Sequence, residues 1–136
     1  MRVSAKADYA LRAAAELAAA DVGPMKAERI SDAQEIPIKF LESILLELKH
    51  AGIVRSQRGP DGGYALARPA NEISLADVIR AVEGPIATVR GVRPDDIDYD
   101  GAARALASVW IDLRTAMRGV LQDTTLADVV ARSTVR

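Results

Sequence analysis

Apolar residues recur at steps of three and four along several stretches of this 136-residue chain, a spacing that predicts amphipathic helices. The first expected helix follows Ser4, a good N-cap, and continues through an alanine-rich stretch until Gly23-Pro24. A short helix is expected at about Lys26–Gln34. A third begins at Ile36-Pro37 and ends at Ala51-Gly52, because proline is tolerated at a helix start and glycine favours a stop.

The second and third expected helices are separated by only a few residues and follow a long helix, an outline typical of a helix-turn-helix. The apolar residues of the third helix collect on one face, and the opposite face carries Lys39, Ser43, Leu46 and His50. The first turns of such a helix usually reach base edges, so we expect Lys39 and Ser43 to contact DNA. Phe40 lies nearer the flank, where core packing and contact with a thymine methyl group are about equally favoured.

The pattern changes to period-two alternation after Gly52, which predicts two short strands joined by a turn at Pro60-Asp61. A hairpin beside a helix-turn-helix is a wing, and cations on it can meet phosphates or enter a minor groove. The residues predicted to bind DNA outside the third helix are Arg55, Gln57, Arg58, Arg2 and Lys6.

A fourth helix is expected from Ser74, with Asp77 completing a capping box, to the stop at Glu83-Gly84. A mixed-charge loop follows, and then a long amphipathic helix of about six turns, with a short last helix capped by Thr125. A small winged domain cannot cover the long apolar stripe, so we expect this helix to pack against its twin in a homodimer. The predicted interface residues are Leu106, Val109, Trp110, Leu113, Met117 and Val120.

These elements predict a mainly α fold with a small β-hairpin, namely a winged helix-turn-helix plus a long dimerisation helix. Residues 1–85 form the expected DNA-binding domain, 86–100 a loop, and 101–136 the dimerisation helix and a C-terminal helix. Trp110 could instead line an effector pocket, although a single tryptophan on an apolar stripe is more often core or interface.

Composition narrows the candidate chemistry. The formal net charge of -1 gives no global support for nucleic-acid binding, so any basic surface must be local. The absence of cysteine excludes disulfides, a thiolate nucleophile and a thiolate-held metal cluster built by this chain alone, and a lone histidine makes a poor metal or catalytic site. We therefore expect no cofactor and no enzymatic activity. No stretch is apolar enough to span a membrane and no leader pattern is present, so a cytoplasmic location is expected.

The sequence Asp96-Ile-Asp98-Tyr-Asp100-Gly101 matches the first half of a calcium loop. The twelfth position of such a loop needs a bidentate glutamate, but here it is Ala107. We interpret these carboxylates as a group placed before the long helix, with Asp100 a candidate N-cap.

Three stretches carry a family resemblance: MRVSAKADYALRA, FLESILLELKHAGIVRSQRGPDGGYALARP and ISLADVIRAVEGP. Over about residues 1–85 the chain resembles the Rrf2 family of bacterial transcription regulators, and RGPDGGYALARP is the most specific part. The resemblance implies a winged helix-turn-helix, a homodimer formed through the long helix, and regulation, here expected to be repression, at short inverted-repeat operators on double-stranded DNA.

The departures from the family pattern also carry information. Iron-sulfur members place three cysteines after the fourth helix, where this chain reads TVRGVRPDDIDYDG, so the resemblance implies a member without a cluster. Asp8, a ligand position in some members, is then interpreted as a surface residue. Glu35 stands where the family often has glycine; a left-handed conformation there would cost about 1–2 kcal/mol, unless the turn is built differently.

One alternative is a winged-helix protein-interaction module that regulates a partner enzyme, which suits the low net charge. The segment from Thr88 to Asp100 alternates Arg90 and Arg93 with aspartates, so it could hold a small-molecule effector, dock a partner protein or be a solvated linker.

Overall fold

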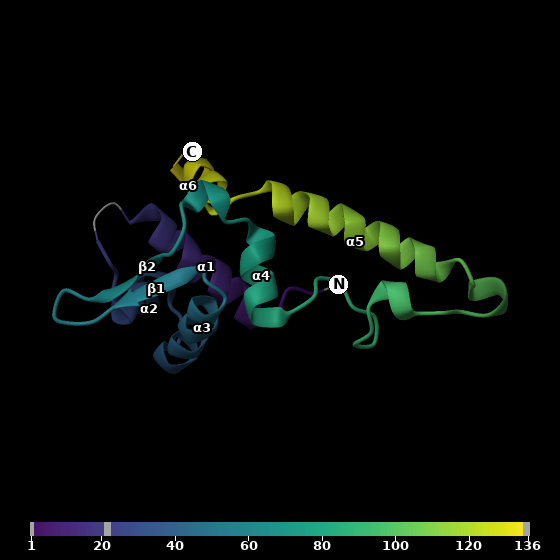
Figure 1. Ribbon diagram of the computed structural model, residues 1–136, viewed down its shortest axis with the longest axis horizontal. Coiled ribbons are helices and arrows are strands. Elements are labelled where there is room, and N and C mark those ends of the chain that lie inside the picture. The colour runs from purple at the N-terminus through teal and green to yellow at the C-terminus, as the bar shows by residue number, and fades with distance from the viewer. Residues whose placement is uncertain (1, 21–22, 135–136) are drawn as a thin grey trace.

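The computed structural model describes residues 2–20 and 23–134 and has the predicted mainly helical fold with one hairpin. Figure 1 shows a winged-helix body and an arm formed by one long helix and the chain segment that runs beneath it. The helices and strands are, in chain order, α1 (Ala5–Ala19), α2 (Ala27–Gln34), α3 (Ile38–His50), β1 (Val54–Gln57), β2 (Gly63–Leu66), η1 (Ala70–Glu72), α4 (Leu75–Glu83), η2 (Pro94–Asp96), η3 (Gly101–Ala103), α5 (Leu106–Asp123) and α6 (Leu126–Thr134).

Helix α1 lies at the centre of the body because its alanines let other helices approach closely. Ala10, Ala13 and Ala14 are fully buried, and α3, α4 and α6 all pack against this helix. The apolar face of α3 completes the core with side chains that have no exposed surface, such as Leu41 and Leu45. Truncating either leucine to alanine would cost about 2–5 kcal/mol, since each would leave a cavity.

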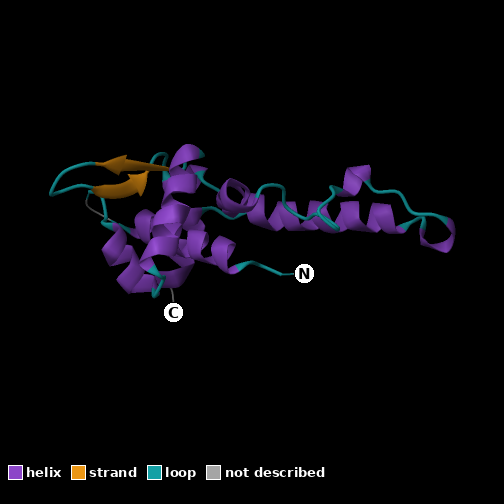
Figure 2. Ribbon diagram, turned by 90° about the horizontal axis from the view of Figure 1, so that it is seen from below, coloured by secondary structure: helices purple, strands orange, loops and turns teal. Residues whose placement is uncertain are grey.

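The wing is a two-stranded antiparallel hairpin in which Val54 faces Leu66 and Gln57 faces Gly63. The Gly62 amide donates to the Gly59 carbonyl at 3.0 Å, so Pro60 and Asp61 are the central turn residues, as predicted. A Cβ atom on Gly62 would lie 2.1 Å from a backbone oxygen of the opposing strand, which explains the glycine. The hairpin therefore has a fixed shape, and Figure 2 shows it projecting from the helical body.

The body also contains α6, which returns to it after α5. The Leu75 amide donates to the Thr124 carbonyl and the Leu126 amide to the Ile73 carbonyl, both at 2.9 Å, and the Leu126 side chain is fully buried. Asp128 closes a capping box with Thr125, whose backbone and side-chain hydrogen bonds lower the pKa of that aspartate. The segment predicted as 101–136 is thus divided in space, since α5 lies in the arm and α6 on α1.

Two expectations for the long helix were wrong. Helix α5 has 18 residues, about five turns rather than six, because the chain first forms the 3₁₀ turn η3. Asp100 precedes η3 and its side chain caps nothing, whereas the residue at the N-cap position of α5 is Ala105. Within the described residues, no helix is long and apolar enough to cross a membrane.

Candidate nucleic-acid interface

The turn between α2 and α3 fixes how the candidate reading helix leaves the body. Glu35 adopts the left-handed conformation, with φ 53° and ψ 48°, so the conventional form of the turn is kept despite the absence of glycine. The Arg12 guanidinium donates to the Gln34 carbonyl at 2.8 Å and lies 4.7 Å from the centre of the Tyr9 ring. Arg12 thereby joins the end of α2 to α1 and holds the helix-turn-helix as one unit.

The outward face of α3 presents a cation, a hydroxyl and an apolar side chain to solvent. Lys39 and Ser43 are exposed in the first turns of the helix, and Leu46 follows with 51% of its surface accessible. Leu46 was placed on this face by its spacing but was not assigned a role, and its exposure now suits apolar contact with a base. Phe40 and Tyr9 form an edge-to-face pair with 5.4 Å between ring centroids, and 36% of the Phe40 surface stays exposed, so Phe40 packs against α1 and is also accessible from outside.

The wing adds a second, cationic part to this surface. Arg55, Gln57 and Arg58 are all exposed, and neither arginine forms an ion pair with any residue in the described ranges. Arg68 differs, because its guanidinium reaches the Glu72 carbonyl at 3.3 Å and lies 3.7 Å from the Asp77 carboxylate. The free cations of the hairpin are therefore those on β1 and at the turn.

The remaining two predicted DNA contacts lie elsewhere. Lys6 donates to the Glu47 carboxylate at 2.9 Å, so part of its charge is neutralised by α3. Arg2 lines a cavity beside Glu83 of α4. The predicted contacts on α3 and on the wing are therefore exposed, whereas Lys6 is paired with Glu47 and Arg2 lies in the wall of a cavity.

The arm is held together by an ion pair that the sequence analysis missed. Arg114 of α5, only 7% exposed, donates two hydrogen bonds of 2.8 and 2.9 Å to the two carboxylate oxygens of Asp95. The hydrogen bond from Arg114 lowers the pKa of Asp95, and Arg93 lies 3.3 Å from the same carboxylate. The sign of this ion pair in the sequence was Arg114 itself, a charged residue next to the apolar stripe of α5. This pair fixes residues 94–96 beneath the long helix.

The apolar stripe of α5 has two sides with different surroundings. The Trp110 indole nitrogen donates to the Tyr99 hydroxyl at 2.9 Å, and Met117 lines the cavity near Arg2, so both face their own chain. Leu106, Val109 and Val120 are 39%, 49% and 68% exposed. Together with Leu113 and Ala116 they follow steps of three, four, three and four, the heptad spacing of a helix that packs against another helix.

Neither Asp8 nor the carboxylates of the arm belong to a metal site within the described residues. Asp8 is exposed and pairs with Arg12 at 3.1 Å, as expected of a surface residue. Across residues 2–20 and 23–134, no group of three or more histidine, cysteine, aspartate or glutamate side chains is arranged to hold a metal ion.

Comparison with known proteins identifies the family. The Rrf2 family model, described as an iron-dependent transcriptional regulator, matches residues 3–132. The chain belongs to the Rrf2 family. The Mycobacterium tuberculosis protein Rv1287 is 52% identical over 130 residues, which cover 95% of this chain and 81% of that protein. The HTH-type transcriptional regulator CymR of Bacillus subtilis is 36% identical, with 96% of this chain and 91% of CymR covered.

Solved structures agree with this assignment. The structure of CymR, the global cysteine regulator of B. subtilis, matches with a TM-score of 0.83 at 33% identity, covering 97% of this chain and 98% of that one. The structure of IscR from T. potens matches with a TM-score of 0.81 at 31% identity, covering 98% and 88%. The predicted winged helix-turn-helix and the prediction of a DNA-binding regulator rather than an enzyme are confirmed.

The donor set of this chain does not suit an iron-sulfur cluster, although the family model is described as iron-dependent. Without a single cysteine the chain cannot supply thiolates to an iron-sulfur cluster, and Asp95, in the corresponding segment, is engaged by Arg114. This Rrf2 protein therefore has no residues that fit the cluster.

Proposed function

We propose that this Rrf2 protein is a homodimeric, cluster-free repressor that acts in the cytoplasm on an inverted-repeat operator. The observation that carries the proposal is the pairing of two surfaces, the exposed face of α3 with its wing and the exposed heptad seam of α5. The first surface suits duplex DNA and the second suits a second copy of the chain.

The seam supports a dimer for an energetic reason. Leu106, Val109 and Val120 leave apolar surface in water along the outer side of the arm. Burial of apolar area is worth about 25 cal/mol per Å², so pairing two seams releases free energy that one chain cannot gain alone. A two-fold axis through the paired arms relates the two α3 helices by rotation, so they would read two inverted half-sites of the operator.

The exposed face of α3 and the wing would make different kinds of contact with DNA. Lys39, Ser43 and Leu46 enter the major groove with α3, where ammonium, hydroxyl and aliphatic groups distinguish base edges. Arg58 follows the backbone or the adjacent minor groove with the wing, and its contribution depends on salt through counterion release. The DNA-binding unit in this proposal is residues 1–85 together with α6, which completes its core.

Repression is the expected outcome where the operator of the proposed dimer overlaps a promoter. Two winged-helix bodies joined through their arms would cover both half-sites of an operator, so an operator that overlaps a promoter is closed to polymerase. A single reporter fusion tests the sign, because deletion of the gene raises expression from a repressed promoter and lowers it from an activated one.

Substitutions on α3 test whether its exposed face contacts the bases. Lys39→Ala and Ser43→Ala should change the preference among operator variants, with about 1–3 kcal/mol lost at the base pair that each residue reads. Lys49→Ala, which removes the same charge from the last turn of the same helix, is the matched control. Fluorescence anisotropy on a set of single-base operator variants measures these differences. An equal loss on every variant would assign Lys39 and Ser43 to phosphate contacts instead.

A further inference from the structure

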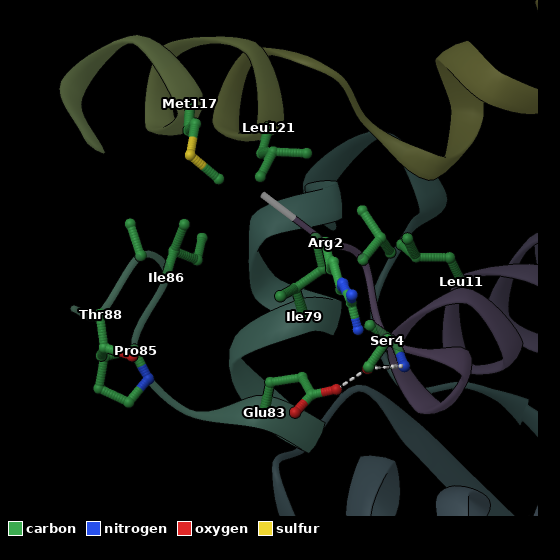
Figure 3. Close-up of a pocket in the computed structure, with 13 residues that line it drawn as sticks. Arg2, Ser4, Leu11, Ile79, Glu83, Pro85, Ile86, Thr88, Met117 and Leu121 are labelled. Carbon is green, nitrogen blue, oxygen red and sulfur yellow. Dashed lines mark hydrogen bonds between the residues drawn. The ribbon is translucent and has the colours of Figure 1, made fainter. Parts of the chain in front are cut away.

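A cavity of about 470 Å³ lies at the joint between the winged-helix body and the arm. Residues of α1 and the segment before it form one wall, α4 forms the second, the chain at 85–88 the third and α5 the fourth. Figure 3 shows Met117 and Leu121 projecting from α5 toward the α4 side of the cavity. The volume falls within the range of about 300–1,000 Å³ that is usual for small-molecule sites.

The interior of this cavity is largely apolar, and its two charged side chains, Arg2 and Glu83, lie with Ser4. Leu11, Ile79, Met117 and Leu121 supply aliphatic and thioether surface. Figure 3 shows Arg2, Ser4 and Glu83 together on the side away from α5. A ligand that fits must therefore combine an aliphatic part directed at α5 with a polar head directed at α1 and α4.

The polar side contains one cation and one anion that do not neutralise each other. The Glu83 carboxylate accepts a hydrogen bond from the Ser4 hydroxyl, which in turn accepts from the Ala7 amide as the N-cap of α1. Within the described part of the chain neither Arg2 nor Glu83 takes part in an ion pair. Arg2 and Glu83 are both exposed, so they lie at the edge of the cavity, where Ser4 positions the carboxylate and both charges can meet a molecule with one negative and one positive group.

A strained backbone position lies in the same wall. Ala87 lines the cavity and has a φ of 62°, a conformation that residues with a side chain rarely adopt. Such strain is found preferentially at ligand-binding and switching sites, where the surrounding structure maintains it. Ala87 also begins the segment that leads into the arm, so the strained residue connects the cavity to the part of the molecule proposed to set the dimer.

We propose that this cavity binds a zwitterionic α-amino acid with an aliphatic side chain and that its occupancy adjusts the arm. Arg2 pairs with the ligand carboxylate, Glu83 with its ammonium group, and the side chain lies against Ile79, Met117 and Leu121. Because the walls belong to both the body and the arm, the ligand binds most tightly at one arm orientation and favours that orientation. Through the proposed dimer, that orientation changes the distance between the two α3 helices, so this regulatory part rests on the proposed function.

The binding site is tested on the purified full-length chain without DNA. L-Leucine is compared with isopentylamine, which lacks the carboxylate, and with 4-methylpentanoate, which lacks the ammonium group. Isothermal titration calorimetry and thermal unfolding should show binding and stabilisation by L-leucine alone. Arg2→Gln and Glu83→Gln should each weaken L-leucine binding by about tenfold or more, since each removes a charge-assisted hydrogen bond. Arg104→Gln and Glu28→Gln, which remove exposed charges away from the cavity, should leave binding unchanged.

Several results would overturn the proposal. Absence of heat and of stabilisation at millimolar L-leucine rejects the amino-acid site, and equal stabilisation by all three compounds shows an apolar hollow without charge recognition. Circular dichroism verifies that the variants fold, and Met117→Ala provides a second test because it should weaken L-leucine through the aliphatic part alone. If Arg2→Gln and Glu83→Gln alter only subunit dissociation, the cavity belongs to the subunit interface and the proposal fails.

The regulatory part has a separate test. L-Leucine binding that leaves operator affinity unchanged rejects the regulatory part, whereas absence of operator binding by the free protein rejects the proposed function.

Discussion

Replacement of Glu35 by glycine should stabilise the protein, although it removes a side chain at the centre of the helix-turn-helix. Glu35 holds φ 53° and ψ 48° at the end of α2, where it is exposed and forms no ion pair with any described residue. A left-handed conformation costs a residue with a Cβ atom about 1–2 kcal/mol. Glycine removes that strain but adds about 0.4–1 kcal/mol of conformational entropy to the unfolded chain. The net gain expected for Glu35→Gly is about 0.5–1 kcal/mol.

Urea unfolding followed by circular dichroism measures this difference. Glu35→Gln is the matched control, because it removes the charge and keeps the strain, so its stability should stay close to that of the parent. Glu35→Asn should lie between the two, since asparagine tolerates the left-handed region better than most residues. A Glu35→Gly protein that is less stable than the parent would refute the strain argument and indicate that the glutamate side chain stabilises the turn.

Three further predictions concern the wing, the seam and the arm. Arg58→Ala should weaken operator binding and reduce the salt slope by about one unit in anisotropy titrations, whereas Arg104→Ala, a cation lost from the arm, should not. Val109→Asp should dissociate the dimer in sedimentation velocity, because it places a charge in the apolar seam, while Thr115→Asp on the opposite face of α5 should leave the dimer intact. Asp95→Asn should remove an acid-dependent part of the stability measured by unfolding across pH. The lowered pKa of Asp95 means that its stabilisation is complete above the unfolded value of about 3.9 and is lost as the pH falls through the folded value.

Much of the winged-helix body could be predicted from the sequence because its helix caps and turn depend on neighbouring residues. Ser4, Ser74 and Thr125 each accept a backbone hydrogen bond as helix caps, and Pro60-Asp61 forms the predicted turn. Each of these features depends on residues within a few positions of one another. Their geometry is therefore encoded in a short stretch of chain and needs no knowledge of the tertiary fold.

The arm was harder to predict because its contacts join distant parts of the chain. The apolar stripe of α5 appeared to be one surface, yet Trp110 bonds Tyr99 and only the side with Val109 and Val120 is exposed. The Asp95–Arg114 pair spans 19 positions, and the sequence analysis placed its aspartate only in the mixed-charge segment from Thr88 to Asp100. Helical periodicity identifies an apolar face but does not say which half of it the same chain covers.

Charge assignments at the candidate interface met the same limit. Lys6 was predicted from its type and position to bind DNA, but its partner Glu47 lies on another helix, 41 positions away. Arg55 and Arg58 form no ion pair with any described residue, and they lie on the hairpin that projects from the body (Figure 2). Residue type and position in the sequence therefore do not tell which cations another part of the chain will pair.

Hydroxyl-radical footprinting of the protein on its operator tests the central claim most directly. The account predicts two protected patches related by a two-fold axis, with centres about one helical turn, roughly 10 base pairs, or a multiple apart, and wing protection flanking each patch. Val109→Asp should lose the paired pattern at concentrations where the parent protects both half-sites. A single unpaired patch, or protection that does not depend on the α5 seam, would contradict a dimeric winged-helix repressor.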